Sequence, residues 1–333
     1  MKLSAMKKVI ETVDQEWKSP LAEKILERWG YDEGSVYYFR SSANFIFVFK
    51  KDGKRYFLRF NDSYERELNM IKSEIKILLY LGTKSLQVAE PVKSINDEYI
   101  EVIETESGIF YAVVFEALQG KQFEIDELEI EQFSNWGAAL GQLHSALTDM
   151  PEEYYVGRKS WKDHLKFVEE ALPKHEAPVK YELDKIKNWI NTLPITKENF
   201  GLIHYDFELD NLRLEDDVVG MLDFDDCANY WFVADIAFAL RDIEGMDLKE
   251  VYFKKFIEGY STQIDVNQLL LKDLPWFRRF HNIVLFAKLL RALDVPETVD
   301  DPDWLRTLRD KLVKRVNNYR DSLEKNFFIK EEQ

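Results

Sequence analysis

The stretch from Gly201 to Asp226, GLIHYDFELDNLRLEDDVVGMLDFDD, constrains the fold of this chain more than any other. Its short apolar runs alternate with polar residues, a pattern that predicts brief strands joined by tight loops. Such strands hold loop side chains rigidly, which is why reaction centres often form where strands end. The stretch therefore predicts a reaction centre built from four polar residues at the expected strand ends: His204, Asp206, Asn211 and Asp223.

Three of these residues have the spacing that phosphoryl transfer requires. Asp206 and Asn211 fit on one loop, and the following hairpin can bring Asp223 beside them. An amide oxygen and a carboxylate are hard ligands that suit Mg²⁺ held together with phosphate oxygens. Asp206 then remains free to accept a proton from a hydroxyl, so the set predicts phosphoryl transfer to an alcohol. The neighbouring Asp216 and Asp217 are interpreted as turn residues.

The pattern His204-x-Asp206-x-x-x-x-Asn211, followed by D-F-D at 223–225, resembles the catalytic and metal-binding loops of the protein-kinase-like superfamily. The H-x-D form and the missing glycine after the phenylalanine resemble the aminoglycoside phosphotransferase and choline kinase branch. The resemblance implies a two-lobed α+β fold, in which an antiparallel sheet with a packed helix precedes a mainly helical lobe. It also implies ATP and Mg²⁺ as cofactors, with Asp206 as the catalytic base and Asn211 and Asp223 as metal ligands.

The same resemblance gives supporting roles to two further residues. His204 is expected to orient the loop and not to act as the base. Asp235 lies at an apolar helix start, where a buried carboxylate needs partners. The family has an aspartate at this position that braces the loop carrying the histidine. Asp225 is expected near a second magnesium ion or its waters.

The first part of the chain predicts a β-meander. Three β-rich runs follow one another, and the turn Asp52-Gly53 separates the last two. The earlier turn, from Arg40 to Asn44, contains no glycine. In the family this turn covers the nucleotide phosphates, which here would be contacted by Ser41, Ser42 and backbone N–H groups. The alternative is an ordinary hairpin turn.

Arg59 lies in the last of these strands between two apolar neighbours, so it points to the opposite face. The family uses a lysine here to hold the α- and β-phosphates, and an arginine can bind phosphate through two N–H groups. A helix expected over residues 63–81 carries two acids that could pair with it. The resemblance favours Glu74, and Glu67 is the alternative. The alternative is that Arg59 is a surface residue of the strand and that the glutamate is a solvated residue on the helix surface.

Strands expected between residues 88 and 116 end at a break, EALQG. In the family this break is the hinge, whose backbone reads the adenine edge. Phe115 would then back the adenine, while Glu116 and Leu118 would supply a carbonyl and an N–H. The predicted organisation is a nucleotide-binding lobe at 1–116, a hinge at 117–120, and a helical catalytic and substrate lobe at 121–333.

Apolar periodicity predicts helices for most of the second lobe, from 128 onward, within 161–192, where Pro173 and Pro178 break the pattern, and from 250 to 328. In the first of these helices Gly137 and Gly141 lie one turn apart and permit close packing. His144 lies on its apolar face and is interpreted as a core histidine with hydrogen-bond partners.

Composition argues against several kinds of partner and location. The net charge of -16 and the pI of about 4.9 disfavour binding to nucleic acid or to anionic membranes. No segment approaches about 18 uncharged apolar residues, and the first residues lack the apolar run of a signal peptide. The single cysteine, Cys227, allows no internal disulfide. A cytoplasmic location is expected, and the sequence leaves the oligomeric state open.

The sequence thus predicts ATP-dependent transfer of the γ-phosphate to a small-molecule hydroxyl, as in an amino alcohol, sugar, homoserine-like compound or aminoglycoside. A Ser/Thr protein kinase of the same branch is an alternative, although no A-P-E segment follows Asp223. Two readings of other classes stay open. One is a nucleotide-binding regulatory protein, favoured by the glycine-free turn and by Arg59, and the other is metal-dependent hydrolysis by the clustered acids.

Overall fold

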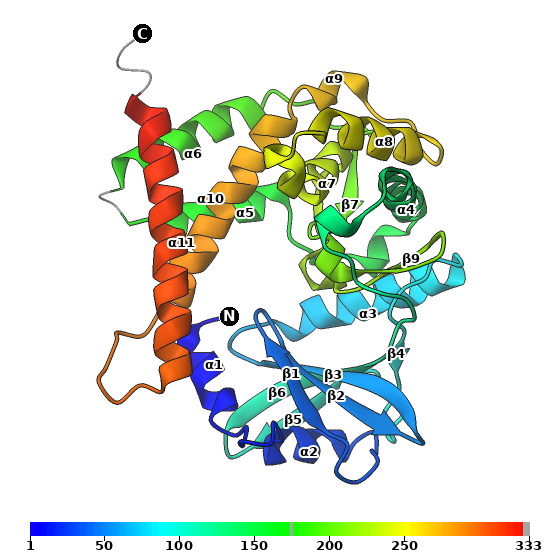
Figure 1. Cartoon of the computed structure of the whole chain (residues 1–333), viewed down its shortest axis with the longest axis vertical. Coiled ribbons are helices and arrows are strands. Elements are labelled where there is room, and N and C mark those ends of the chain that lie inside the picture. The colour runs from blue at the N-terminus through cyan, green and yellow to red at the C-terminus, as the bar shows by residue number, and fades with distance from the viewer. Residues whose placement is uncertain (174–175, 329–333) are drawn as a thin grey trace.

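The computed structural model describes residues 1–173 and 176–328, and the chain forms two lobes (Figure 1). The first lobe is built on a six-stranded sheet and the second is mainly helical. The predicted two-lobed α+β fold is therefore confirmed. The end of the predicted second lobe, at residues 329–333, lies outside the described residues.

The first lobe begins with two short helices and continues through the sheet and one long helix. Helix α2 begins where the sequence caps it, because Ser19 Oγ accepts the Ala22 N–H at 3.3 Å and Pro20 occupies its first turn. The β2–β3 turn has positive φ at Asp52 and Gly53, as a two-residue hairpin requires. The elements are α1 (Leu3–Ile10), α2 (Pro20–Leu26), β1 (Tyr37–Ser41), β2 (Phe45–Lys51), β3 (Lys54–Asp62), α3 (Leu68–Thr83), β4 (Pro91–Val92), β5 (Glu101–Thr105) and β6 (Gly108–Glu116).

The two faces of the sheet have different partners. The strand order is β1-β2-β3-β6-β4, and β5 also pairs with β6. Because side chains alternate along a strand, Phe47 and Leu58 point to the face that packs on α1 and α2. Val113 and Phe115 point the other way and join the core of the second lobe. The second face, on which Arg59 also lies, therefore meets the second lobe.

Helix α3 begins at Leu68, five residues later than the sequence predicted. The delay has a local cause, because Asp62 Oδ1 accepts the Tyr64 N–H at 2.9 Å and its carbonyl accepts the Glu65 N–H at 2.9 Å. These bonds fold residues 62–66 into a turn that competes with the helix. The apolar side chains of α3 belong to the same buried cluster as the second lobe. The helix thus links the sheet to the second lobe.

The second lobe surrounds two short β-ribbons with helices. The ribbon of β7 with β10 was not predicted, because residues 228–231 were not recognised as a strand. Pro178 lies in the first turn of α6 and does not break a helix there. The main elements are α4 (Ile130–Thr148), α5 (Trp161–Ala171), α6 (Ala177–Ile190), β7 (Phe200–Ile203), β8 (Leu212–Glu215), β9 (Val218–Met221), β10 (Ala228–Trp231), α7 (Phe232–Ala239), α8 (Lys249–Ser261), α9 (Gln268–Leu271), α10 (Leu274–Ala292) and α11 (Asp303–Phe328).

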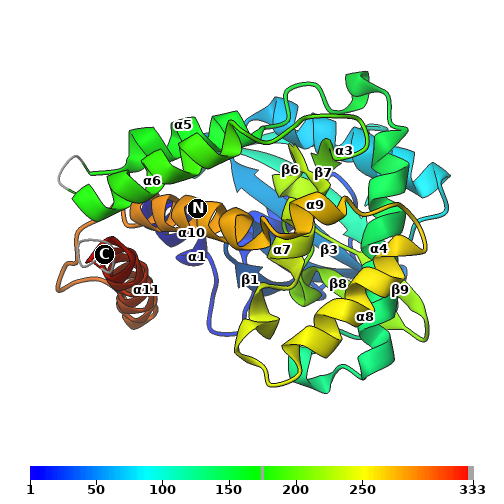
Figure 2. The same cartoon turned by 90° about the horizontal axis from the view of Figure 1, so that it is seen from above.

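Five short 3₁₀ turns complete the described elements. Two of them, η3 and η4, carry the ends of the predicted catalytic and metal-binding loops. Figure 2 shows α5, α6 and α10 running alongside one another at one side of this lobe. The turns are η1 (Ile125–Glu127), η2 (Glu152–Tyr154), η3 (Leu209–Asn211), η4 (Phe224–Asp226) and η5 (Arg241–Gly245).

Helices α4 and α8 pack with their backbones in contact, as the glycines of α4 predicted. A Cβ on Gly137 would lie 1.9 Å from Phe256 O, and a Cβ on Gly259 would lie 1.9 Å from Ser134 O. Backbone atoms cannot move aside as a flexible side chain can. The approach of the two helices therefore depends on glycine at both positions.

Gly259→Ala is expected to lower the free energy of unfolding by about 3 kcal/mol, because the added methyl forces α4 and α8 apart. Gly245→Ala is the matched control, since nothing lies within 4 Å of its Cβ position. It should change stability by no more than about 0.5 kcal/mol. Urea unfolding of the two variants checks this, and equal stabilities would contradict the described packing.

The C-terminal helices return to the first lobe, a contact that the sequence did not predict. Arg291 of α10 binds Glu65 through two hydrogen bonds of 3.0 and 3.1 Å, and Lys7 of α1 pairs with Asp301 at 2.9 Å. Trp304 and Leu308 of α11 pack against the core of the first lobe. Figure 1 shows α11 extending beside α10 down to α1. The end of α10 and the start of α11 thus pack against α1 and the first lobe.

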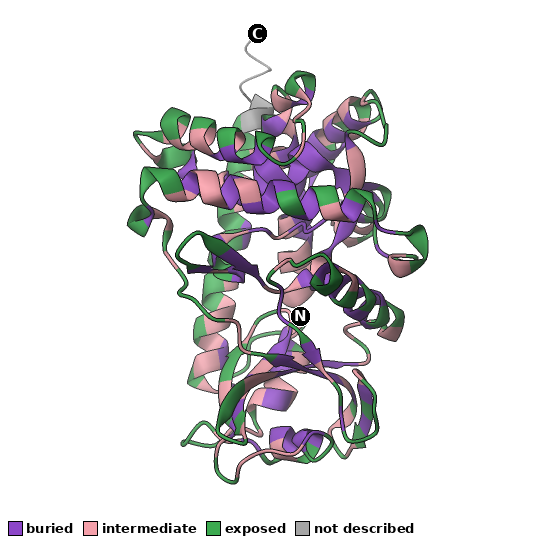
Figure 3. Ribbon diagram, turned by 90° about the vertical axis from the view of Figure 1, so that its right-hand side faces the viewer, coloured by how far each residue is buried: buried purple, intermediate pink, exposed green. Residues whose placement is uncertain are grey.

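Buried residues concentrate along the inner faces of the second-lobe helices and between the sheet and α2 (Figure 3). Within residues 1–173 and 176–328, no helix combines the length and the apolarity that crossing a membrane requires.

Candidate active site

The loop that follows β7 is held by one buried carboxylate. Asp235, in the first turn of α7, accepts the N–H groups of His204 and Tyr205, both at 2.8 Å. His144 Nε2 lies 3.0 Å from the same carboxylate, and its Nδ1 lies 2.8 Å from the Tyr260 hydroxyl. Tyr205 has φ of 73°, a strained conformation that these bonds maintain. Asp235 is thus placed as the predicted bracing role requires, and His144 is the partnered core histidine that was predicted.

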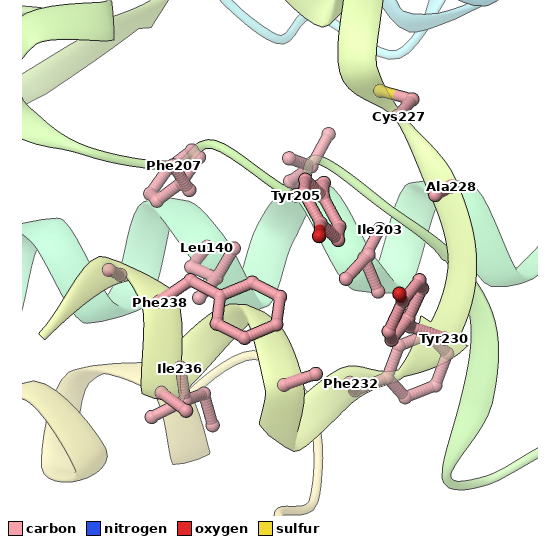
Figure 4. Close-up of a cluster of buried hydrophobic side chains, with 14 of the residues drawn as sticks. Leu140, Ile203, Tyr205, Phe207, Cys227, Ala228, Tyr230, Phe232, Ile236 and Phe238 are labelled. Carbon is pink, nitrogen blue, oxygen red and sulfur yellow. The ribbon is translucent and has the colours of Figure 1, made fainter. Parts of the chain in front are cut away.

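Apolar side chains anchor the same loop. Figure 4 shows Ile203, Tyr205 and Phe207 in the buried cluster with Tyr230 and Phe238. The Tyr205 ring lies 5.3 Å from the Tyr230 ring and 5.1 Å from the Phe238 ring, measured between centroids. Buried apolar residues therefore alternate with the polar residues of the loop. This alternation fixes the direction of the polar side chains between them.

The contacts of His204 fit the predicted orienting role. Its Nε2 lies 3.0 Å from the Leu222 carbonyl, to which it donates, and its Nδ1 accepts the Asp206 N–H at 3.3 Å. Only the neutral ring can donate at one nitrogen and accept at the other. Burial lowers the pKa of His204, which also favours the neutral ring. The histidine therefore ties the Asp206 loop to the residue preceding Asp223.

Asp206 and Asn211 are joined directly. The Asn211 side-chain nitrogen donates to the Asp206 carboxylate at 2.9 Å and to its carbonyl at 3.0 Å. The Asn211 carbonyl accepts the Leu222 N–H at 2.8 Å. The amide oxygen of Asn211 is left as the atom that can serve a cation. Leu222 thus connects both loops, and all three predicted reactive residues lie around it.

Asp223 has features that suit a metal ligand. It adopts a left-handed conformation with φ of 60°, which is uncommon for a residue other than glycine. Its Oδ1 is buried without a hydrogen-bond partner among the described residues. Burial, and then the nearby Asp225 carboxylate, raise its pKa well above the usual range. A divalent cation nearby would supply positive charge that stabilises the ionised form of this carboxylate.

The residues fit a cation that takes most of its ligands from outside the protein. In the described part of the chain, no group of three or more His, Cys, Asp or Glu side chains is arranged to hold a metal. Asn211 and Asp223 offer two oxygen donors, which is the number that Mg²⁺ commonly uses when phosphates and waters complete its shell. These two residues therefore remain the predicted metal ligands.

Arg59 and Glu74 form a buried pair across the inner face of the first lobe. Two hydrogen bonds of 2.7 and 2.6 Å join them, and the side chains are 6% and 2% exposed. Burial alone would lower the pKa of Arg59, but the carboxylates of Glu74, Asp225 and Asp223 together outweigh it and raise the pKa. Arg59 Nη1 also lies 3.6 Å from Asp223 Oδ1, and the guanidinium lies over the Phe115 ring at 5.0 Å. The pair favoured by the resemblance, with Glu74 and not Glu67, is therefore present, and it reaches the predicted metal-binding loop at residues 222–227, called the metal loop below.

A pocket of about 410 Å³ lies between the lobes and contains most of the predicted nucleotide-binding residues. Arg59, Glu74, Phe115, Glu116 and Leu118 line it together with Asp223, and Asp206 and Asn211 do not. The Leu118 N–H has no hydrogen-bond partner among the described residues, so it is available to a ligand. The pocket thus extends from the hinge to the metal loop.

Ser41 and Ser42 do not line this pocket. Ser41 pairs with Phe45, so its side chain points to the face that packs on α1 and α2, and its hydroxyl is buried without a partner among described residues. Ser42 is exposed, and its N–H donates to the Asn44 carbonyl at 3.2 Å. Phosphate contact by this turn remains a prediction for Ser42 and the backbone.

The partners of Asp225 and Asp226, the two acids after Asp223, were not predicted from the sequence. Asn44 donates to Asp225 at 2.9 Å, and Arg66 pairs with both Asp225 and Asp226. Lys288 of α10 binds Asp226 at 2.8 Å. Asp225 is 7% exposed and engaged by protein groups, an arrangement in which it holds the lobes together. No local signal marked Asn44, because its partner lies 181 positions away.

Arg158 was also not predicted, and its side chain fixes the metal loop through bonds to backbone carbonyls. Its guanidinium donates to the carbonyls of Cys227 at 2.9 Å, Asp225 at 2.6 Å and Phe224 at 3.2 Å. A fourth bond, of 3.1 Å, reaches the Met70 carbonyl in α3. A buried arginine that saturates backbone carbonyls in this way joins the metal loop to the helix that carries Glu74. Nothing in the flanking sequence, GRKSW, indicates this function.

Buried histidines make the fold sensitive to acid. Burial lowers the pKa of His164 to about 3, and it lowers the pKa of His281 well below the usual range. Below about pH 6.5 the unfolded chain binds protons at these residues and the folded chain does not, so stability falls as pH falls. We expect a loss of about 1.4 kcal/mol per pH unit for each histidine.

Urea unfolding at pH 7.5 and pH 5.5 checks this expectation. His164→Gln, which keeps a polar group near the Tyr230 hydroxyl, should show a shallower pH dependence than the unchanged protein, by one proton. An equal slope for both proteins would show that His164 is protonated in the folded state as well.

Comparison with known proteins places this geometry in a family. The sequence matches the profile of the phosphotransferase enzyme family over residues 39–270. It is 23% identical to amicoumacin kinase of Bacillus subtilis (strain 168) over 284 residues, which cover 80% of this chain and 83% of that protein.

The fold is similar to those of several solved kinases. The structure of amicoumacin kinase hAmiN in complex with AMP-PNP, Ca²⁺ and Ami matches with a TM-score of 0.80 and 21% identity, over 96% of each chain. The microcompartment-associated aminopropanol kinase matches with a TM-score of 0.72 and 19% identity, over 92% of this chain and 97% of that one. Spectinomycin phosphotransferase in complex with ADP and spectinomycin matches with a TM-score of 0.61 and 15% identity, over 91% and 97%. The resemblance inferred from the two loops is confirmed, and the chain belongs to the phosphotransferase enzyme family.

Proposed function

We propose that this protein transfers the γ-phosphoryl group of ATP, bound with Mg²⁺, to a hydroxyl of a small molecule that also carries an amino group. One observation carries the proposal: the loops of Asp206, Asn211 and Asp223 are joined around Leu222, and Leu222 and Asp223 line a pocket that extends to residues 116–118. This is the set that phosphoryl transfer needs, namely a base, two oxygen ligands and a nucleotide pocket.

Each residue has a distinct part in the proposed reaction. The hinge N–H of Leu118 binds the adenine edge, and Arg59, held by Glu74, binds the phosphates. Asp206 accepts the proton of the acceptor hydroxyl while that oxygen forms a bond to the γ-phosphorus and the bond to ADP breaks. Asn211 and Asp223 would hold Mg²⁺, which neutralises charge on the phosphates.

The length of the segment after Asp223 supports a small acceptor. Helix α7 begins at Phe232, so only a 3₁₀ turn and β10 separate the metal loop from the helix. A typical protein kinase has a long activation segment in this place, on which a peptide lies. The related proteins named above include kinases of amicoumacin and of aminopropanol. An amino alcohol or an antibiotic with neighbouring amino and hydroxyl groups is therefore the acceptor that we propose.

The experiment is an assay of Mg²⁺-dependent ADP release with a panel of acceptors: amino alcohols, sugars, homoserine, aminoglycosides, amicoumacin and a generic protein. The expected result is stimulation by an amino-bearing small molecule, with one phosphoryl group added to it as seen by mass spectrometry. Stimulation by the protein substrate alone would instead favour a protein kinase. Binding of Mg²⁺-ATP with no transfer to any acceptor would favour a regulatory protein.

A further inference from the structure

An irregularity in the first strand redirects one arginine. Tyr38 of β1 pairs with Phe47 of β2, but the next pair is Arg40 with Ile46, so Phe39 is an extra residue. A bulge of this kind changes the face to which the following side chains point. Without it, Arg40 would lie opposite Phe45, on the face that packs on α1 and α2.

The bulge aligns Arg40 with Arg59. Ile46 pairs with Arg40 on one side and with Arg59 on the other, so the three side chains share the face that lines the pocket. Arg40 Nη2 lies 4.0 Å from Asp223 Oδ2, while Arg59 Nη1 lies 3.6 Å from Asp223 Oδ1. Two guanidinium groups therefore converge on the predicted metal ligand.

The contact with Asp223 does not account for this placement. The Arg40 side chain is 45% exposed, and an exposed ion pair at 4.0 Å contributes little to stability. Arg213 of β8 lines the same pocket from the second lobe. Arg40 and Arg213 therefore place two like charges on one pocket. An anion between them would relieve this repulsion.

We propose that Arg40 binds the phosphates of the nucleotide together with Arg59, in the place where kinase-like folds use a glycine-rich turn. The proposal rests on the proposed function, because it assumes that the pocket holds a nucleoside triphosphate. The turn from Ser41 to Asn44 has no glycine, so its backbone approaches phosphate less freely, and the Ser41 hydroxyl points away from the pocket. A guanidinium supplies the lost contacts through several N–H donors.

The test is calorimetric binding of Mg²⁺-ATP and of adenosine to the unchanged protein, Arg40→Met and Arg40→Gln. We expect both variants to raise the Kd for Mg²⁺-ATP about tenfold or more and to leave the Kd for adenosine unchanged, because only ATP carries phosphates. Lys50→Met is the matched control. Lys50 is an exposed cation in β2 that does not line the pocket, so this variant should bind both ligands normally.

The outcomes separate this proposal from the proposed function. If the unchanged protein binds Mg²⁺-ATP and phosphorylates an acceptor, but Arg40→Met and Arg40→Gln bind ATP normally, only the role of Arg40 is overturned. An equal loss of affinity for ATP and for adenosine overturns it as well, since Arg40 would then shape the pocket and not bind phosphate. If the unchanged protein binds no Mg²⁺-ATP, both proposals fail.

Discussion

Asp206→Asn is expected to lower kcat about 10³-fold while the affinity for Mg²⁺-ATP stays within about twofold. The variant keeps an oxygen that can accept the hydrogen bond from Asn211, so the loop should keep its shape. What it loses is the capacity to take a proton from the acceptor hydroxyl. Steady-state kinetics with the acceptor from the panel, together with calorimetric ATP binding, checks both halves of this expectation.

Asp217→Asn is the matched control for this substitution. Asp217 is exposed on the β8–β9 turn, where its carboxylate accepts a hydrogen bond from Asn135 at 2.9 Å. Removing its charge should leave kcat and the KM for ATP unchanged. Normal turnover in Asp206→Asn, with the acceptor still phosphorylated, would remove Asp206 from the role of base.

Asp223→Asn is expected to lower kcat/KM at least about 100-fold and to raise the Mg²⁺ concentration needed for half-maximal activity. The reason is that a neutral amide binds the cation less strongly and cannot balance its charge, a contribution of several kcal/mol in metal-assisted reactions. Titration of activity with Mg²⁺ at saturating ATP and acceptor measures the shift. In contrast to Asp206→Asn, ATP binding should also weaken when Mg²⁺ is present.

A second comparison makes this prediction specific to the metal. Binding of ATP in the presence of a chelator should be similar for Asp223→Asn and the unchanged protein, because no cation then joins Asp223 to the phosphates. If activity titrates with Mg²⁺ identically in both proteins, Asp223 is not a metal ligand.

The sequence could predict which polar residues of the second lobe lie together, because their signals are local. His204, Asp206 and Asn211 lie within one loop, and the motif fixes their order and spacing. The Arg59–Glu74 pair needed the family resemblance as well, because the helical pattern left both Glu67 and Glu74 within reach of the arginine.

The missed features depend on contacts that are distant in the sequence. Arg158 bonds to carbonyls on both the metal loop and α3, and carbonyls leave no trace in a sequence because every residue has one. The contact of Arg291 with Glu65 spans 226 positions. Strand pairing was a third feature that the sequence could not show. The extra residue Phe39 shifts the register by one, which moves Arg40 and Ser41 each to the opposite face of the sheet.

The central claim is that Asp206 assists transfer of a phosphoryl group from ATP to a hydroxyl, and a single-turnover reaction tests it most directly. The unchanged protein and Asp206→Asn are each mixed in excess with Mg²⁺, an amino alcohol acceptor such as aminopropanol or the best acceptor of the panel, and ATP labelled at the γ-phosphate. The account predicts label on the acceptor with the unchanged protein, and bound but unreacted ATP with Asp206→Asn. Release of label as inorganic phosphate at the same rate from both proteins would contradict it.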